Sequence, residues 1–133
     1  MSEQNAEIVR AAYEAFDRGD LDAVSELQDP AVEWRTSEED PDAAIHSGRE
    51  AVRRYFEGYL ETFPGLRAEL EECVGVSERQ VLTTVRYTGR ARASGMEMDW
   101  RQSVLYTLRA GLIVRVEEYF DRDQALEAVE RSE

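Results

Sequence analysis

Cysteine is almost absent from this sequence, which also lacks long apolar runs and clusters of metal-binding side chains. The single cysteine, Cys73, cannot form a disulfide within the chain, and this favours a reducing compartment, the cytoplasm. His46 is the only histidine, so no His/Cys cluster exists, and we expect neither a metal nor a cofactor. No segment approaches the ~18 consecutive apolar residues of a membrane helix. The first residues lack the basic and apolar parts of a secretory signal, so we expect no leader and no membrane association.

Basic residues are also few, because 16 of them face 29 acidic residues and leave a net charge of −13. A field of this sign repels phosphate backbones and anionic lipid surfaces, which argues against nucleic-acid binding. At 133 residues, with 42% hydrophobic and 34% charged side chains, the chain fits one globular domain that spans residues 1–133.

Apolar residues recur at helical spacing in three segments of the first half of the sequence. The first stripe comprises Ile8, Val9, Ala12, Tyr13 and Phe16, and the second, after the capping residue Asp20, comprises Leu21, Val24 and Leu27. The third runs from Val52 to Phe63, and Ser47 with Glu50 in front of it has capping-box spacing. The sequence therefore predicts three helices.

In the second half the apolar period changes to two, which is typical of half-buried strands. The turn signals Ser94-Gly95 and Ala110-Gly111 predict antiparallel neighbours. The last strand, Leu112 to Phe120, leads into a short helix for which Asp121 and Gln124 have capping-box spacing. We predict an α+β fold in which three N-terminal helices pack on a strongly curved mixed or antiparallel sheet, with a short C-terminal helix.

A polar segment separates the second and third predicted helices. Ala31 to Thr36 is expected to be a short strand, and Ser37 to His46 is too acidic to pack and reads as a solvated, mobile lid. Its acidic spacing fits no calcium loop. His46 could act as an acid or a base near neutral pH, but a position at a loop end favours a packing or surface role.

Several segments, taken in order, resemble one known family. Phe16-Asp17-Arg18-Gly19-Asp20-Leu21-Asp22-Ala23, Gly48-Arg49-Glu50-Ala51-Val52, the turns at Ser94-Gly95 and Gly111 to Arg115, and the ending Tyr119-Phe120-Asp121-Arg122 with Ala125-Leu126 carry the resemblance. The chain resembles SnoaL-like proteins of the nuclear transport factor 2-like (ketosteroid isomerase-like) superfamily over essentially its whole length. The resemblance implies a cone-shaped α+β barrel around an apolar pocket and a homodimer formed through the outer sheet face. It leaves isomerase, polyketide cyclase, epoxide hydrolase, dehydratase and non-catalytic binding functions open.

The chain departs from the patterns of two of these activities. Ketosteroid isomerase-like members carry a Tyr and two Asp residues where this chain has Ala12 (next to Tyr13), Trp34 and Ser103. SnoaL-type cyclases carry a histidine in the region that corresponds to Arg90–Ser103, which contains none. Neither mechanism is therefore expected in its usual form.

Asp99, Arg101 and Glu118 form the candidate catalytic group. Asp99 and Arg101 are two apart on one strand and share a face with Ser103, and Glu118 interrupts the apolar row of Val114, Val116 and Phe120. A carboxylate in an apolar row needs a cation or a proton, and Arg101 is the expected cation. The acid–arginine–acid arrangement resembles that of limonene-epoxide-hydrolase-like enzymes. A structural ion network, or a β-bulge that turns these residues to solvent, is the alternative.

Aromatic side chains dominate the candidate ligand-binding set. Tyr55 and Tyr59 are first of all core residues, but a buried tyrosine needs a hydroxyl partner, which a ligand can provide. The predicted ligand-binding residues are Trp34, Tyr13, Tyr55, Tyr59, Ser103, Val116 and Phe120. Trp100 and Tyr106 lie opposite to Arg101 on their strand, so they are predicted to face outward, at a dimer interface.

Three functions remain open at this point. The first is binding, and in some cases hydrolysis, isomerisation or cyclisation, of a small hydrophobic molecule, which requires a cavity of at least ~300 Å³. The second is a ligand-binding module without chemistry, and the third is a dimerisation module.

Overall fold

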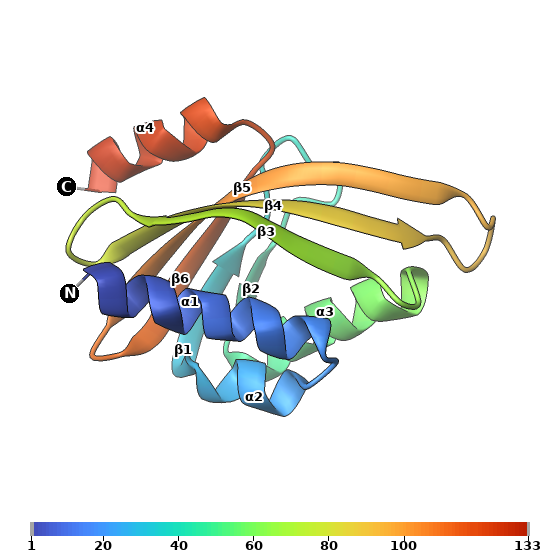
Figure 1. Cartoon of the computed structure of the whole chain (residues 1–133), viewed down its shortest axis with the longest axis horizontal. Helices are drawn as coiled ribbons and strands as arrows, with labels where there is room; N and C mark the ends of the chain where they lie inside the picture. The colour runs from blue at the N-terminus through green and yellow to red at the C-terminus, as the bar shows by residue number, and fades with distance from the viewer. Residues whose placement is uncertain (1, 133) are drawn as a thin grey trace.

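The computed structural model describes residues 2–132, in which four helices pack on one six-stranded sheet (Figure 1). The elements in chain order are α1 (Ser2–Asp17), α2 (Leu21–Glu26), β1 (Gln28–Arg35), β2 (Ile45–Ser47), α3 (Arg49–Thr62), β3 (Arg67–Gly75), β4 (Gln80–Arg90), β5 (Glu97–Arg109), β6 (Leu112–Tyr119) and α4 (Arg122–Ser132). The strand order is β2-β1-β6-β5-β4-β3, with β1 and β6 parallel and the other neighbours antiparallel. The predicted α+β fold is confirmed.

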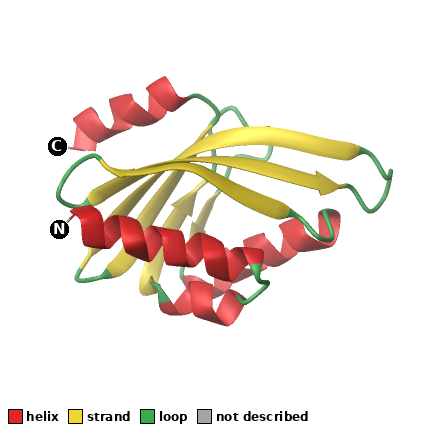
Figure 2. Ribbon diagram, viewed as in Figure 1, coloured by secondary structure: helices red, strands yellow, loops and turns green. Residues whose placement is uncertain are grey.

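Helices cover both faces of the curved sheet (Figure 2). The three N-terminal helices lie on the face that we call the inner face, where α1 contacts β3 and β4, and α3 contacts β1 and β2. On the outer face α4 contacts β4, β5 and β6. The sheet is therefore the middle layer, and β4, β5 and β6, which α4 covers, can bury side chains on two sides.

The main apolar core lies between the inner face and the three helices. Val9 of α1, Val52 of α3 and Val116 of β6 are fully buried in this core. On the outer face, Leu82 and Leu105 form a cross-strand pair and are fully buried as well. Burial on both faces explains why Val104, Leu105 and Tyr106 form a continuous apolar run in β5.

The predicted capping residues at the starts of α2 and α4 are confirmed, and the one predicted for α3 is wrong. Asp20 accepts a hydrogen bond from the Ala23 amide at 3.1 Å, and Asp121 accepts one from the Asp123 amide at 2.8 Å. At α3 the residue before the helix is Gly48, with φ of 89°, and no side chain caps the helix. Ser47 belongs instead to the short strand β2, because its backbone pairs with β1.

The acidic segment of residues 36–44 is the loop that connects β1 to β2 (Figure 1). Thr36 closes the loop at its base, because its hydroxyl and its amide both form hydrogen bonds with the backbone of Ala44.

None of the helices in the described residues is long and apolar enough to cross a membrane.

Candidate functional site: an aromatic cavity around Glu118

An aromatic cavity lies between the inner face of the sheet and the three N-terminal helices. Its lining consists of Ala12, Tyr13, Phe16, Val24, Gln28, Trp34, Tyr55, Phe56, Tyr59, Leu66, Tyr87, Trp100, Gln102, Tyr106, Ile113 and Glu118. Glu118 is the one acidic residue in this lining, and no arginine or histidine belongs to it in the described part of the chain. The free volume is about 50 Å³, which is room for roughly four water molecules. The cavity is thus smaller than the ~300 Å³ expected for a larger ligand.

Glu118 is held by two aromatic donors. The indole Nε1 of Trp34 donates to Oε2 of Glu118 at 2.7 Å, and the Tyr55 hydroxyl lies 3.0 Å from both carboxylate oxygens and donates to them. The side chain of Gln102 adds a further hydrogen bond. Glu118 is 6% exposed. Because its partners Trp34, Tyr55 and Gln102 belong to β1, α3 and β5, these three elements together set the orientation of its carboxyl group.

Burial raises the pKa of Glu118 from 4.5 to about 7. Desolvation is the main cause, and the negative charge of Asp40 adds to it, whereas the hydrogen bonds from Trp34 and Tyr55 act in the opposite direction. A carboxyl group that titrates near neutral pH can exist in both forms under physiological conditions. It is therefore suited to accept or donate a proton.

A chain of buried hydroxyl groups forms another part of the cavity wall. The Tyr106 hydroxyl donates to the Tyr13 hydroxyl at 2.8 Å, the Tyr13 and Thr83 hydroxyls are 3.0 Å apart, and Thr83 donates to the Val104 carbonyl. This order makes Tyr13 the donor to Thr83. Burial raises the pKa of Tyr13 and Tyr106, which stay neutral. With its proton directed at Tyr13, the Tyr106 oxygen has lone pairs left to accept from a ligand.

His46 lies behind the cavity wall, and its ring stacks on that of Tyr55 with a centroid distance of 4.5 Å. Desolvation lowers the pKa of His46. The predicted packing role of this histidine agrees with this stacking, which helps to fix the tyrosine that binds Glu118.

A second, larger cleft of about 680 Å³ lies between the acidic segment, the end of β6 and α4. It is lined by Glu38, Glu39, Glu117, Glu118 and Glu127 together with Arg35, Thr36, Ser37, Ala43, Ala44, Ile45, Tyr119 and Gln124. Arg35 is the one basic residue that the described part of the chain contributes to this lining, and it is paired with Glu33. Glu118 belongs to the linings of both spaces. The acidic cleft therefore adjoins the aromatic cavity at the carboxylate.

The prediction that Asp99 and Arg101 face the cavity with Glu118 is wrong. The antiparallel register of β5 and β6 pairs Val104 with Glu118 and Tyr106 with Val116, and paired residues share a face. The even-numbered residues of β5 around this point are therefore the inner ones. Asp99 and Arg101 have odd numbers, point to the outer face, and are exposed.

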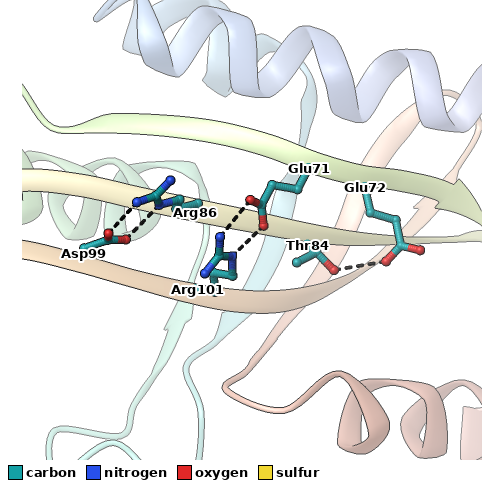
Figure 3. A network of polar contacts seen from close by, with 6 residues as sticks. All are labelled: Glu71, Glu72, Thr84, Arg86, Asp99 and Arg101. Atoms are coloured by element: carbon teal, nitrogen blue, oxygen red, sulfur yellow. Dashed lines mark hydrogen bonds and ion pairs between the residues drawn. The ribbon is translucent and has the colours of Figure 1, made fainter.

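These two residues belong instead to an ion-pair network on the outer face (Figure 3). Arg86 donates to both carboxylate oxygens of Asp99, and Arg101 donates to those of Glu71 at 2.7 and 3.1 Å. The arginines lower the pKa of Asp99 and of Glu71. This is the structural ion network that the sequence left open as an alternative to catalysis.

The predicted ligand-binding residues divide into two groups. Tyr13, Trp34, Tyr55 and Tyr59 line the cavity, as Glu118 does. The prediction is wrong for Ser103, Val116 and Phe120, none of which is in the lining. Ser103 is buried on the outer side of β5, Val116 is fully buried in the core, and Phe120 is 45% exposed after the end of β6.

Four cavity residues on β4 and β5 were not predicted from the sequence to face the ligand. Trp100 and Tyr106, predicted to face outward, line the cavity, and Tyr87 stacks on Trp100 with a centroid distance of 5.3 Å. Gln102 was not considered at all. A usable signal existed, because the row Trp100, Gln102, Val104, Tyr106 is more apolar than the row that contains Asp99 and Arg101.

Comparison with known proteins agrees with the observed fold. A solved structure of Bal32a, from a soil-derived mobile gene cassette, is 30% identical with a TM-score of 0.81, and the match covers 96% of each chain. A putative SnoaL-like polyketide cyclase from Jannaschia sp. CCS1 is 21% identical with a TM-score of 0.79, covering 96% of this chain and 92% of that one. An uncharacterized protein of Mycobacterium tuberculosis is 27% identical over 123 residues, 92% of each chain. A family model described as a SnoaL-like domain matches residues 9–116. The chain belongs to the SnoaL-like domain family.

Proposed function

We propose that this domain binds a small molecule with an apolar body in the aromatic cavity, and that Glu118 exchanges a proton with it. The observation that carries the proposal is the buried carboxyl group of Glu118, which two hydrogen-bond donors orient and no arginine neutralises within the described residues. Burying such a group is costly, so its presence needs a reason that packing alone does not supply.

A single acid–base group favours reactions that move one proton. The carboxylate can take a proton from a carbon next to a carbonyl group, and the resulting acid can return it at another atom, as in an isomerisation or a cyclisation. Epoxide hydrolysis by an acid–arginine–acid group is not proposed, because Asp99 and Arg101 lie on the outer face. The similarity to a structure named as a putative polyketide cyclase supports this choice of reaction class.

The first experiment measures whether Glu118 titrates as proposed. We expect NMR of a sample labelled at glutamate side chains to give a pKa of about 7 for Glu118, and Glu118→Gln to remove that signal. A thermal-shift screen of small ketones and polyketide fragments, run on both proteins, then separates binding from chemistry. A pKa close to ~4 would remove the basis for proton transfer.

The alternative is a binding module without chemistry, which the small size of the cavity favours. It predicts ligands that stabilise the wild type and Glu118→Gln to a similar extent. Turnover of a bound ligand by the wild type, abolished in Glu118→Gln, would reject this alternative.

We also infer that the chain works as a homodimer in the cytoplasm. The dimer would use the part of the outer sheet face around Arg86 and Asp99, where side chains of both signs are exposed and could contact a second copy in a self-complementary manner. Sedimentation at micromolar concentration tests it, and a monomeric protein would reject it.

A further inference from the structure

We propose that the ligand of the aromatic cavity is a small organic cation, an alkylammonium whose charge pairs with Glu118 and whose carbon atoms lie against the surrounding rings. This inference rests on the proposed binding of a small molecule at this cavity, and it is independent of whether a proton is transferred. It is carried by four observations on the cavity and its surroundings.

The first observation is the character of the cavity wall. Nine of its lining residues are aromatic, namely Tyr13, Phe16, Trp34, Tyr55, Phe56, Tyr59, Tyr87, Trp100 and Tyr106. The faces of aromatic rings attract cations, and several rings around one centre form the cages in which proteins bind alkylated ammonium groups. Trp34 lies edge-on to Phe56 at 4.9 Å, and Tyr59 lies edge-on to Tyr55 at 5.2 Å, so the rings present faces in different directions.

The second observation is the charge inside the cavity. Glu118 is the one ionisable carboxyl group in the described lining, and its two strongest hydrogen-bond partners are neutral donors, Trp34 and Tyr55. Among the described residues no basic side chain forms an ion pair with this buried carboxylate. A ligand cation would supply the counter-ion and would remove the cost of ionising the group in an apolar site.

The third observation is the available space. A free volume of about 50 Å³ admits a ligand with the bulk of roughly four waters, which means about five non-hydrogen atoms. An alkylammonium such as tert-butylammonium has this size, whereas a multi-ring compound would require the aromatic side chains to move apart.

The fourth observation is the acidic cleft that adjoins the cavity. Four glutamates besides Glu118 line it, and the arginine in its lining is paired with Glu33. A cleft of one sign concentrates ions of the opposite sign and accelerates their arrival. With a net charge of −13, the whole protein adds to this field. The cleft is thus the expected approach route for a cation.

Two ligands of equal shape test the inference. Tert-butylammonium and tert-butanol each have five non-hydrogen atoms but differ in charge. We expect calorimetry or NMR at pH 8 to show that the wild type binds the ammonium at least about tenfold more tightly than the alcohol. Glu118→Gln should remove this preference. The matched control is Glu69→Gln, which deletes the same charge at an exposed position of β3, outside the linings of the cavity and the cleft, and should change the affinity by less than about threefold.

The pH dependence provides a second readout. The groups that face Glu118 are Trp34 from β1, Tyr55 and Tyr59 from α3, Gln102 from β5, Tyr13 from α1 and, at longer range, Tyr87, Tyr106 and Asp40. The tyrosines among them have raised pKa values and stay neutral. The affinity for the ammonium should therefore rise with pH up to the pKa of Glu118 and level off above it. His46→Gln should keep this profile, which separates the carboxyl group from the nearby imidazole.

The outcomes separate this inference from the proposed function. Equal or tighter binding of tert-butanol, competed by other ligands of the cavity, would overturn the cation while leaving the small-molecule site in place. Retention of ammonium affinity in a folded Glu118→Gln, checked by circular dichroism, would also overturn it. Absence of ammonium binding to the wild type at millimolar concentration would reject it outright.

Discussion

Carboxyl groups on the two faces of the sheet have opposite environments. On the outer face, Asp99 and Glu71 are each bound by an arginine in water, and their pKa values are lowered. On the inner face, Glu118 is bound by an indole and a phenol away from water, and its pKa is raised. Charge pairing therefore marks the structural surface of this protein. Glu118, the proposed proton-transfer group, has no counter-ion among the described residues.

The largest expected effect concerns the stability of the protein as the pH changes. Because the pKa of Glu118 is raised from 4.5 to about 7 in the folded state, folding favours its protonated form. This contribution is fully present below pH 4.5 and is lost as the pH rises through 7, at a cost of about 3 kcal/mol. Glu118→Gln keeps the shape and cannot ionise, so it should gain up to about 3 kcal/mol over the wild type at pH 8. Urea unfolding at pH 5 and pH 8 measures this, and an equal difference at both values would contradict it.

A smaller effect is expected on the pKa of Glu118 when its hydrogen-bond donor Trp34 is replaced. Trp34→Phe removes the indole N–H. Because the hydrogen bond from this group lowers the pKa of Glu118 in the wild type, the pKa of Glu118 should rise in the variant. NMR titration of the Glu118 carboxyl measures the change. Tyr106→Phe is the control, because that hydroxyl bonds to Tyr13 and not to the carboxylate. A similar rise in the control would show that general loosening of the cavity is responsible.

The hydroxyl groups of Tyr106, Tyr13 and Thr83 allow the contribution of uncharged buried hydrogen bonds to stability to be tested. Tyr106→Phe should cost about 1 kcal/mol in the free energy of unfolding, because one buried hydrogen bond is lost. Thr83→Val should cost more, about 2 kcal/mol, because it leaves the Tyr13 hydroxyl buried without its acceptor. Urea unfolding ranks the two variants, and a reversed ranking would contradict the assigned direction of these hydrogen bonds.

The smallest effect is expected on the outer face. Asp99→Asn removes the partner of an exposed Arg86, and exposed ion pairs contribute little to stability. The unfolding midpoint near neutral pH should stay within experimental error of the wild type. If this variant instead destabilised the protein as strongly as Thr83→Val, the contrast between the two faces would be lost.

Much of the fold could be predicted from the sequence because it rests on local patterns. The stripe from Val52 to Phe63 predicted α3, and Asp20 and Asp121 were correctly identified as capping residues. β2 was missed because its three residues, Ile45–Ser47, are stabilised by pairing with β1 rather than by their own pattern. Short edge strands of this kind carry too few residues for a period to be visible.

Glu118 and four aromatic residues of the cavity could be found from the sequence. Glu118 interrupts an apolar row, Trp34 is the large side chain of a predicted strand, and the three tyrosines lie in helical stripes. Alternation along β5 and β6 determined which residues of one strand share a face. It did not determine which face of β5 meets which face of β6, since a change of one residue in the pairing inverts the answer. The register, with Val104 opposite Glu118, and its shift beyond Thr107, which brings Ile113 to the cavity, exist only in the folded sheet. Tertiary pairing therefore decided that the carboxylate is surrounded by aromatic rings and that the arginine lies on the other side.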